Sequence, residues 1–329
     1  MGAAFDLHPE MQGLVAAKQK VSGAPASKDL RDAWNSYGDS MQRPYPADMV
    51  VEDRLLETPG CGRALTPVRI YRPAAVRETA APCVLYVHGG SFVKGSLDSG
   101  DAIAWGIADQ VPAVVVSIDY RLAPEHPFPA AVEDCYAVLQ TVAANAATLG
   151  VDSERIGVWG DSAGGGLSAG LCLLARDRNG PRIAAQALNY PMLTDELTSD
   201  AYRTYAESPG AQTASLDACW SLYLGERRPT DDPYAAPLKA RDLAGLPPAH
   251  VHIAEIDPLA DDGRRYAQRL EQAGCTVELR VARRMIHGFL RARFFGPDSS
   301  REFAQPCAFL ARWLRAAHDS TAISRSSPR

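Results

Sequence analysis

The sequence has little of what membrane and nucleic-acid-binding proteins need. No apolar run approaches the ~20 residues that span a bilayer, so we expect no membrane-spanning segment. The net charge is −5 and no basic block is present, which argues against a nucleic-acid partner. The first residues contain neither the positive nor the apolar segment of a secretory signal, so the sequence predicts a cytoplasmic protein.

Cysteine is present but follows no pattern. The seven cysteines are scattered, and the sequence contains no C-x-x-C motif and no Cys/His cluster. An odd and dispersed set argues against a disulfide framework and against a zinc site. We therefore expect a reduced protein with no metal and no other cofactor, in which several cysteines are small apolar core residues.

What the sequence does contain is a regular alternation of apolar runs and helical patterns. The strands that we expect are 49–57, 68–71, 83–88, 113–119, 155–159, 183–189, 249–256 and 276–281. The helices that we expect are 101–110, 129–149, 162–177, 215–224, 258–273 and 301–317. Near-continuous Val, Ile, Leu and Ala in the strands favours a parallel sheet that is covered on both faces. The sequence thus predicts an α/β fold with a mostly parallel eight-stranded sheet.

Two segments stand outside this alternation. Residues 1–45 are helical or loop-like, and about sixty residues separate the sixth and seventh expected strands, a length that often forms a lid. We expect an N-terminal cap segment (1–45), a domain over 46–318 that carries the sheet and a cap insertion at about 192–230, and a disordered polar tail (319–329).

The most informative motif is Gly160-Asp161-Ser162-Ala163-Gly164, directly after an apolar strand and before a helical pattern. Glycines at both ends allow a tight turn that exposes the serine hydroxyl. The motif predicts Ser162 as a nucleophile for acyl transfer. A second match centres on Ser168, but it lies two turns into the following helix among leucines, so we interpret Ser168 as a packing residue.

A serine nucleophile needs a base to take its proton and an acid to orient that base. Of the histidines after Ser162, His250 and His252 start a strand and His318 lies in the tail, whereas His287 follows the last expected strand. We therefore predict His287 as the base.

The acid should follow another strand between the serine and the histidine. Asp257 directly follows the 249–256 strand, before Pro258, and is the predicted acid, although it also suits a helix N-cap. Glu255, Asp261 and Asp262 are close rivals.

The tetrahedral intermediate of acyl transfer needs amide donors for its oxyanion. One donor is expected from the residue after the nucleophile, which is Ala163, and others from a glycine loop after the third strand. His88-Gly89-Gly90 occupies that place, so we predict Gly89, Gly90 and Ala163 as the oxyanion hole.

Taken together, these segments resemble the hormone-sensitive-lipase family of α/β-hydrolases, also called bacterial family IV esterases. The matching segments are His88–Gly90, Asp119–Ala130, Gly160–Gly165, Asp257-Pro258-Leu259 and His287-Gly288-Phe289. The resemblance implies an α/β-hydrolase fold with a helical cap, and Ser162, Asp257 and His287 as a triad. It departs at Ser91, where the family has a third glycine. Dimerisation through a terminal strand and helix is suggested only by analogy.

We expect a serine carboxylesterase that acts on small, short-chain acyl esters. Two alternatives stay open. An amidase or deacetylase would use the same residues, and a non-catalytic receptor of the same fold would lack the histidine that stands here at position 287. Pocket shape depends on aromatic residues of the cap, among them Trp34 and Tyr37, while Tyr190 suits either the acyl pocket or the core.

Overall fold

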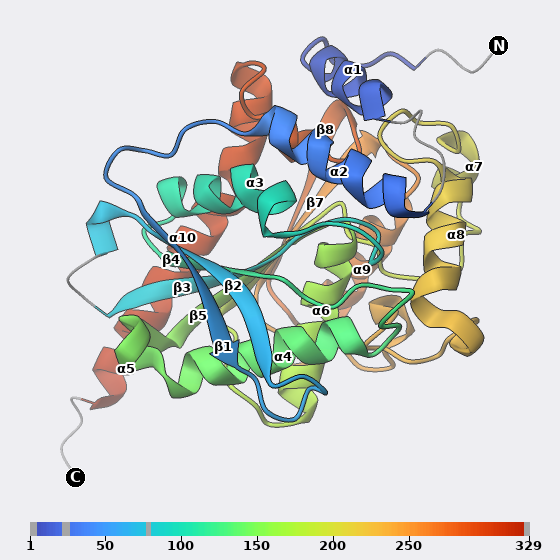
Figure 1. Ribbon diagram of the computed structural model, residues 1–329. Helices are drawn as coiled ribbons and strands as arrows, with labels where there is room; N and C mark the ends of the chain where they lie inside the picture. The colour runs from blue at the N-terminus through green and yellow to red at the C-terminus, as the bar shows by residue number, and fades with distance from the viewer. Residues whose placement is uncertain (1–4, 22–26, 77–79, 326–329) are drawn as a thin grey trace.

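The computed structural model describes residues 5–21, 27–76 and 80–325 (Figure 1). Within these ranges the strands form one sheet in the order β1-β2-β4-β3-β5-β6-β7-β8. The pairs β1–β2 and β2–β4 are antiparallel, and all other neighbouring pairs are parallel. The mostly parallel eight-stranded sheet that the sequence predicts is therefore confirmed.

The strands are β1 (Val50–Glu57), β2 (Leu65–Arg72), β3 (Ala81–Val87), β4 (Val114–Ile118), β5 (Val151–Asp161), β6 (Ala185–Asn189), β7 (Ala249–Ile256) and β8 (Val277–Ile286). The helices are α1 (Met11–Val21), α2 (Ser27–Met41), α3 (Leu97–Gln110), α4 (Ala130–Ala144), α5 (Ala146–Leu149), α6 (Ala163–Asp177), α7 (Asp200–Thr204), α8 (Thr213–Leu224), α9 (Ala260–Gln272) and α10 (Pro297–Arg325).

Helices cover both faces of the sheet (Figure 1). Helices α4, α6 and α9 pack on one face, and α3 and α10 pack on the other. Successive residues of β3 enter the two cores in turn, with Leu85 and Val87 in the first and Val84 and Tyr86 in the second. Because both faces of this strand are buried, its sequence is apolar throughout rather than alternating.

Two of the helices differ most clearly from the expected ones. The 129–149 helix is divided at Asn145 into α4 and α5. Helix α10 starts at Pro297 and continues to Arg325, through most of the tail that we expected to be disordered over 319–329, while 326–329 lie outside the described residues. Three alanines at positions 316, 317 and 322 favour this continuation, because alanine has the highest helix propensity.

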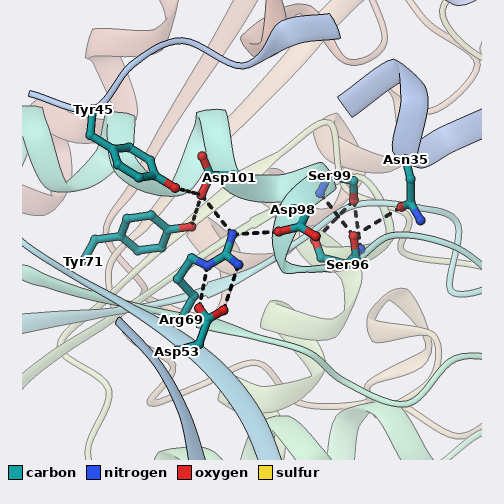
Figure 2. A network of polar contacts seen from close by, with 9 residues as sticks. All are labelled: Asn35, Tyr45, Asp53, Arg69, Tyr71, Ser96, Asp98, Ser99 and Asp101. Carbon is teal, nitrogen blue, oxygen red and sulfur yellow. Dashed lines mark hydrogen bonds and ion pairs between the residues drawn. The ribbon is translucent and has the colours of Figure 1, made fainter. Parts of the chain in front are cut away.

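A polar network fastens the antiparallel edge of the sheet to the start of α3 (Figure 2). Arg69 on β2 binds Asp53 on β1 at 2.6 and 2.9 Å, and it reaches Asp98 in the first turn of α3 at 2.9 Å. The hydroxyl groups of Tyr45 and Tyr71 both donate to Asp101, at 2.8 and 2.7 Å. Residues 91–96 connect the His88-Gly89-Gly90 loop to α3, so this network holds the far end of that connection in place.

A second network, centred on Glu302 of α10, leads to a prediction about stability. Its carboxylate accepts hydrogen bonds from Arg280 on β8, at 2.5 and 2.7 Å, and lies 3.0 Å from His252 Nε2 on β7. Burial alone would raise the pKa of Glu302, but the hydrogen bonds from His252 and Arg280 lower it to about 2. The stabilisation is therefore complete above the ordinary pKa of 4.5 and is lost as the pH falls toward 2.

We expect Glu302→Gln to lower the free energy of unfolding by about 1–3 kcal/mol at pH 7, and by clearly less at pH 3. Urea unfolding at the two pH values measures the difference. Glu278→Gln is the control, because Glu278 is 48% exposed where it pairs with Arg312, and we expect it to cost less than about 1 kcal/mol. An equal cost of Glu302→Gln at both pH values would contradict the prediction.

Candidate active site

Ser162 lies at the junction of β5 and α6, at the carboxyl end of the sheet. Its backbone has φ 58° and ψ −121°, an uncommon conformation for a residue with a side chain. The surrounding hydrogen bonds hold it: the Ser162 amide donates to the Asn189 carbonyl at 2.9 Å, and its carbonyl accepts from the amides of Gly166 and Met192 at 3.1 Å. The strained turn that the motif predicts is therefore present.

The glycines of the motif are needed because the backbone approaches itself closely at this turn. A Cβ atom on Gly160 would overlap the carbonyl oxygen of Gly164, and one on Gly164 would overlap the carbonyl oxygen of Val87 on β3. A larger residue at Gly164 would push the elbow away from β3, and one at Gly160 would push the start of α6 away from the end of β5.

His287 and Asp257 reach Ser162 from the ends of the last two strands. His287 directly follows β8, which runs five residues beyond the end expected from the sequence, and Asp257 directly follows β7. His287 Nε2 lies 2.8 Å from Ser162 Oγ, and His287 Nδ1 lies 2.8 Å from Asp257 Oδ2. With its proton on Nδ1, the ring donates to the carboxylate and can accept from the serine hydroxyl. The structure thus brings the three predicted side chains together.

The fixed position of Asp257 follows from its burial and its hydrogen bonds. Its side chain is fully buried, and Oδ1 accepts the backbone N–H of Leu259 at 3.0 Å while Oδ2 faces His287. Asp257 thus has the orienting position that the sequence suggested, but it is not the helix N-cap, because α9 starts at Ala260 with Leu259 as its N-cap residue and Asp257 caps only the turn before it.

The rival carboxylates have other partners. Glu255 binds Arg283 at 2.6 Å and the Arg284 amide at 2.7 Å. Asp261 accepts the amide of Ala201, and Asp262 accepts the hydroxyl of Tyr202 at 2.6 Å. Burial raises the pKa of Asp262 to about 8, so this carboxyl is largely uncharged at neutral pH.

The rival histidines and the second serine also lie elsewhere. His252 faces Glu302, and His250 lies 3.9 Å from Glu278. The side chain of His318 lies outside the described residues. Ser168 is fully buried in α6, with no hydrogen-bond partner for its Oγ within the described part of the chain.

The predicted glycine loop lies against the elbow, but the Gly89 amide is already engaged. It donates to Asp161 Oδ1 at 3.0 Å, and the same oxygen accepts the Tyr86 hydroxyl at 2.9 Å. Gly89 therefore ties the loop to the elbow and does not offer the free amide that the sequence predicted. The carboxylate of Asp161, which sequence reasoning did not single out, is the reason.

The next two residues of the loop face the cavity. Gly90 has φ 148°, and a Cβ atom there would overlap the carbonyl oxygen of Lys94. Ser91, at the position of the usual third glycine, has φ 55°, so it keeps a glycine-like backbone despite its side chain. Gly90, Ser91 and Ser162 line one cavity together.

That cavity has a volume of about 480 Å³, within the range of small-molecule sites. The N-terminal helices contribute Lys18 from α1 and Trp34 and Tyr37 from α2 to its wall. Residues 207–212, 215 and 216, from the segment between β6 and β7, form another part. Tyr190 is fully buried and also lines the cavity, with its ring 4.8 Å from the His287 ring. It is therefore both a core residue and a cavity residue, the two positions considered for it from the sequence.

Several cavity residues carry charge and were not found from the sequence. Lys94 and Arg291 line the wall, and neither belongs to a recognisable motif. In the described ranges no group of three His, Cys, Asp or Glu side chains is placed to hold a metal ion. Nor does any helix in those ranges have the length and apolarity needed to cross a membrane.

Comparisons with known proteins give the family. A family model described as an alpha/beta hydrolase fold matches residues 84–291. The carboxylesterase NlhH of Mycobacterium tuberculosis is 41% identical over 277 residues, which cover 82% of this chain and 86% of that protein. The ethyl acetate hydrolase of Pseudomonas putida is 35% identical over 229 residues, 68% of this chain and 71% of that protein.

A solved structure agrees with these matches. The esterase of Pyrobaculum calidifontis superposes with a TM-score of 0.83 at 35% identity, covering 93% of this chain and 98% of that chain. The fold, the family model and the named relatives all indicate an esterase of the α/β-hydrolase fold. The chain therefore belongs to the hormone-sensitive-lipase-like, or bacterial family IV, branch of the α/β-hydrolases and is a carboxylic-ester hydrolase.

Proposed function

We propose that the protein hydrolyses short-chain acyl esters with Ser162 as nucleophile, His287 as general base and acid, and Asp257 as the group that orients His287. The observation that carries the proposal is the continuous hydrogen-bonded chain from Ser162 Oγ through the imidazole to Asp257, with 2.8 Å at each step. A serine hydroxyl is a poor nucleophile without such a base, and the base needs a fixed tautomer.

The reaction then runs in two steps. Ser162 Oγ attacks the ester carbonyl while His287 Nε2 takes its proton, and the imidazolium formed is stabilised by Asp257. His287 gives that proton to the leaving alcohol. Water then attacks the acyl-enzyme with His287 again as base, which releases the carboxylic acid and restores the serine.

The oxyanion of each tetrahedral intermediate needs backbone donors. We assign this role to the amides of Gly90 and Ala163, with Ser91 as a third donor from the same loop. Gly89 is left out of the set because its amide donates to Asp161. One such donor typically contributes about 10²–10³-fold in rate.

We further propose that the N-terminal segment 1–45 and the insertion at about 192–230 act together as a cap over the site. The proposal is supported by the cavity wall, which takes residues from α1, α2 and the segment around Pro209. A capped cavity of about 480 Å³ has to hold the acyl chain, the ester and the alcohol portion together. Short acyl groups suit that space, and the name of the ethyl acetate hydrolase relative agrees with it.

Hydrolysis of p-nitrophenyl esters from acetate to laurate tests the acyl preference. We expect kcat/KM to be highest between acetate and hexanoate and roughly tenfold or more lower at laurate, because a long chain does not fit the cavity. A maximum at decanoate or laurate would contradict the proposal. The matched anilide, p-nitroacetanilide, distinguishes an amidase, which would hydrolyse it about as fast as the ester.

A further inference from the structure

Buried hydrogen-bond donors without partners gather around the cavity. They are Trp34 Nε1, Tyr37 Oη, Tyr190 Oη and Arg291 Nη2, and none has a hydrogen-bond partner within the described part of the chain. A buried donor left unsatisfied costs about 1–3 kcal/mol, so several in one cavity indicate a ligand that supplies acceptors.

Lys94 and Arg291 each make a cation–π contact with the indole ring of Trp34. Lys94 Nζ lies 5.0 Å from the centre of the Trp34 ring, and Arg291 Cζ lies 5.3 Å from it. Arg291 is only 4% exposed, and its Nη1 donates to the Ser99 carbonyl at 2.5 Å. Among the described residues, no carboxylate lies within ion-pair distance of Lys94 or Arg291.

A third cation, Lys18, is repelled by the positive charges of Lys94 and Arg291. Lys18 Nζ lies 3.5 Å from the carbonyl oxygen of His287 and also contacts the Gly210 carbonyl. Burial, followed by repulsion from Arg291 and Lys94, lowers the pKa of Lys18 to about 7. The cavity wall formed by Lys18, Lys94 and Arg291 therefore holds three basic groups whose mutual repulsion disfavours their charged forms.

The carboxylates near the cavity do not neutralise this wall by direct contact. Asp161 attracts Arg291 at longer range, but its Oδ1 accepts from Tyr86 and Gly89. Asp257 faces His287, and Glu207 accepts a hydrogen bond from Gln212. These carboxylates are thus engaged elsewhere, while within the described residues Trp34 Nε1 and Arg291 Nη2 lack an acceptor, which is the arrangement that an anionic ligand would complete.

We propose that the ester substrate carries a carboxylate group, bound by Lys94 beside Trp34 on the positively charged wall of the cavity that holds Ser162. This inference rests on the proposed function and names the substrate class for it. The carboxylate does not react: water and the ester give the acid and the alcohol as before. The acyl part or the alcohol part of the ester can bear the charge, and matched substrates distinguish the two.

Two substrate pairs replace one terminal methyl group by a carboxylate. Monoethyl glutarate is compared with ethyl pentanoate for the acyl side, and 4-acetoxybutanoate with butyl acetate for the alcohol side. We expect the charged member of one pair to have a kcat/KM at least about tenfold higher, as a charge-assisted hydrogen bond allows. The pair that shows the preference gives the side that carries the charge.

Lys94→Met should lower the charged-to-neutral ratio of kcat/KM by about tenfold. Lys239→Met is the matched control, because Lys239 pairs with Glu196 and is not among the residues that line the cavity. It should leave the ratio unchanged. The inference is overturned if neither charged ester exceeds its neutral partner, or if both variants keep the same ratio as the original protein.

A binding measurement keeps the inference separate from the proposed function. If none of the four esters is hydrolysed, the proposed function fails, and calorimetry with glutarate and 4-hydroxybutanoate still tests the anion site. Binding of either anion that Lys94→Met weakens and Lys239→Met does not would support the site. Absence of binding by both anions would overturn it.

Discussion

Replacing Ser162 with alanine is expected to abolish ester hydrolysis, with kcat lower by about 10⁶-fold, as for the nucleophile of a well-studied serine protease. Without Oγ no acyl-enzyme can form, and His287 Nε2 loses the hydroxyl that lies 2.8 Å away. The remaining activity would come from substrate binding and the oxyanion donors alone. Hydrolysis of p-nitrophenyl acetate measures it, with circular dichroism to show that the fold is retained.

Ser168→Ala is the matched control for this prediction. Both serines stand at the centre of a G-x-S-x-G match, but Ser168 is buried in α6, six residues after Ser162, and its Oγ has no partner within the described residues. Removing that hydroxyl should therefore leave kcat within about twofold, since no interaction is lost. A Ser162→Ala protein that keeps more than a few per cent of the original rate would show that another residue is the nucleophile.

The parts of the fold that the sequence predicts well are those decided by local composition. The buried strands β3 and β4 are apolar in nearly every residue. Strand β5 ends at Asp161 and β7 ends directly before Asp257, and a turn follows each aspartate, so these two ends are visible in the sequence. The end of β8 is less visible. Arg283 and Arg284 look like the end of a strand, yet Glu255 on β7 binds the Arg283 side chain and the Arg284 amide and carries the pairing on to Ile286.

The site, too, has residues that the sequence predicts and residues that it does not. Ser162, Asp257 and His287 are predictable because each follows a strand, and parallel strands bring their ends to one edge of the sheet. The engagement of the Gly89 amide depends on the direction of one carboxylate, that of Asp161, and no sequence pattern fixes such a direction. The composition of the cavity wall is equally hidden, because Trp34 and Arg291 are more than 250 residues apart and meet only in the folded chain.

Asp257→Asn is expected to lower kcat by about 10⁴-fold, as the same change does in a well-studied serine protease, with KM little altered. An asparagine amide would donate to His287 Nδ1 and place the ring proton on Nε2, which could then no longer accept from Ser162. KM should stay similar because Asp257 is fully buried beneath the histidine and is not among the cavity-lining residues. Steady-state kinetics on p-nitrophenyl acetate separates the two constants.

Asp262→Asn is the control, because it shows whether the loss of activity depends on Asp257 or would follow from replacing any buried aspartate near the site. Asp262 is as deeply buried as Asp257, but its raised pKa, about 8, leaves it largely protonated at pH 7, and its hydrogen bond comes from the Tyr202 hydroxyl. An asparagine oxygen can accept that bond, and little charge is lost, so kcat should stay within about threefold. If Asp262→Asn instead caused the large loss and Asp257→Asn a small one, the orienting acid would be Asp262, and His287 would have to turn away from Asp257 during turnover.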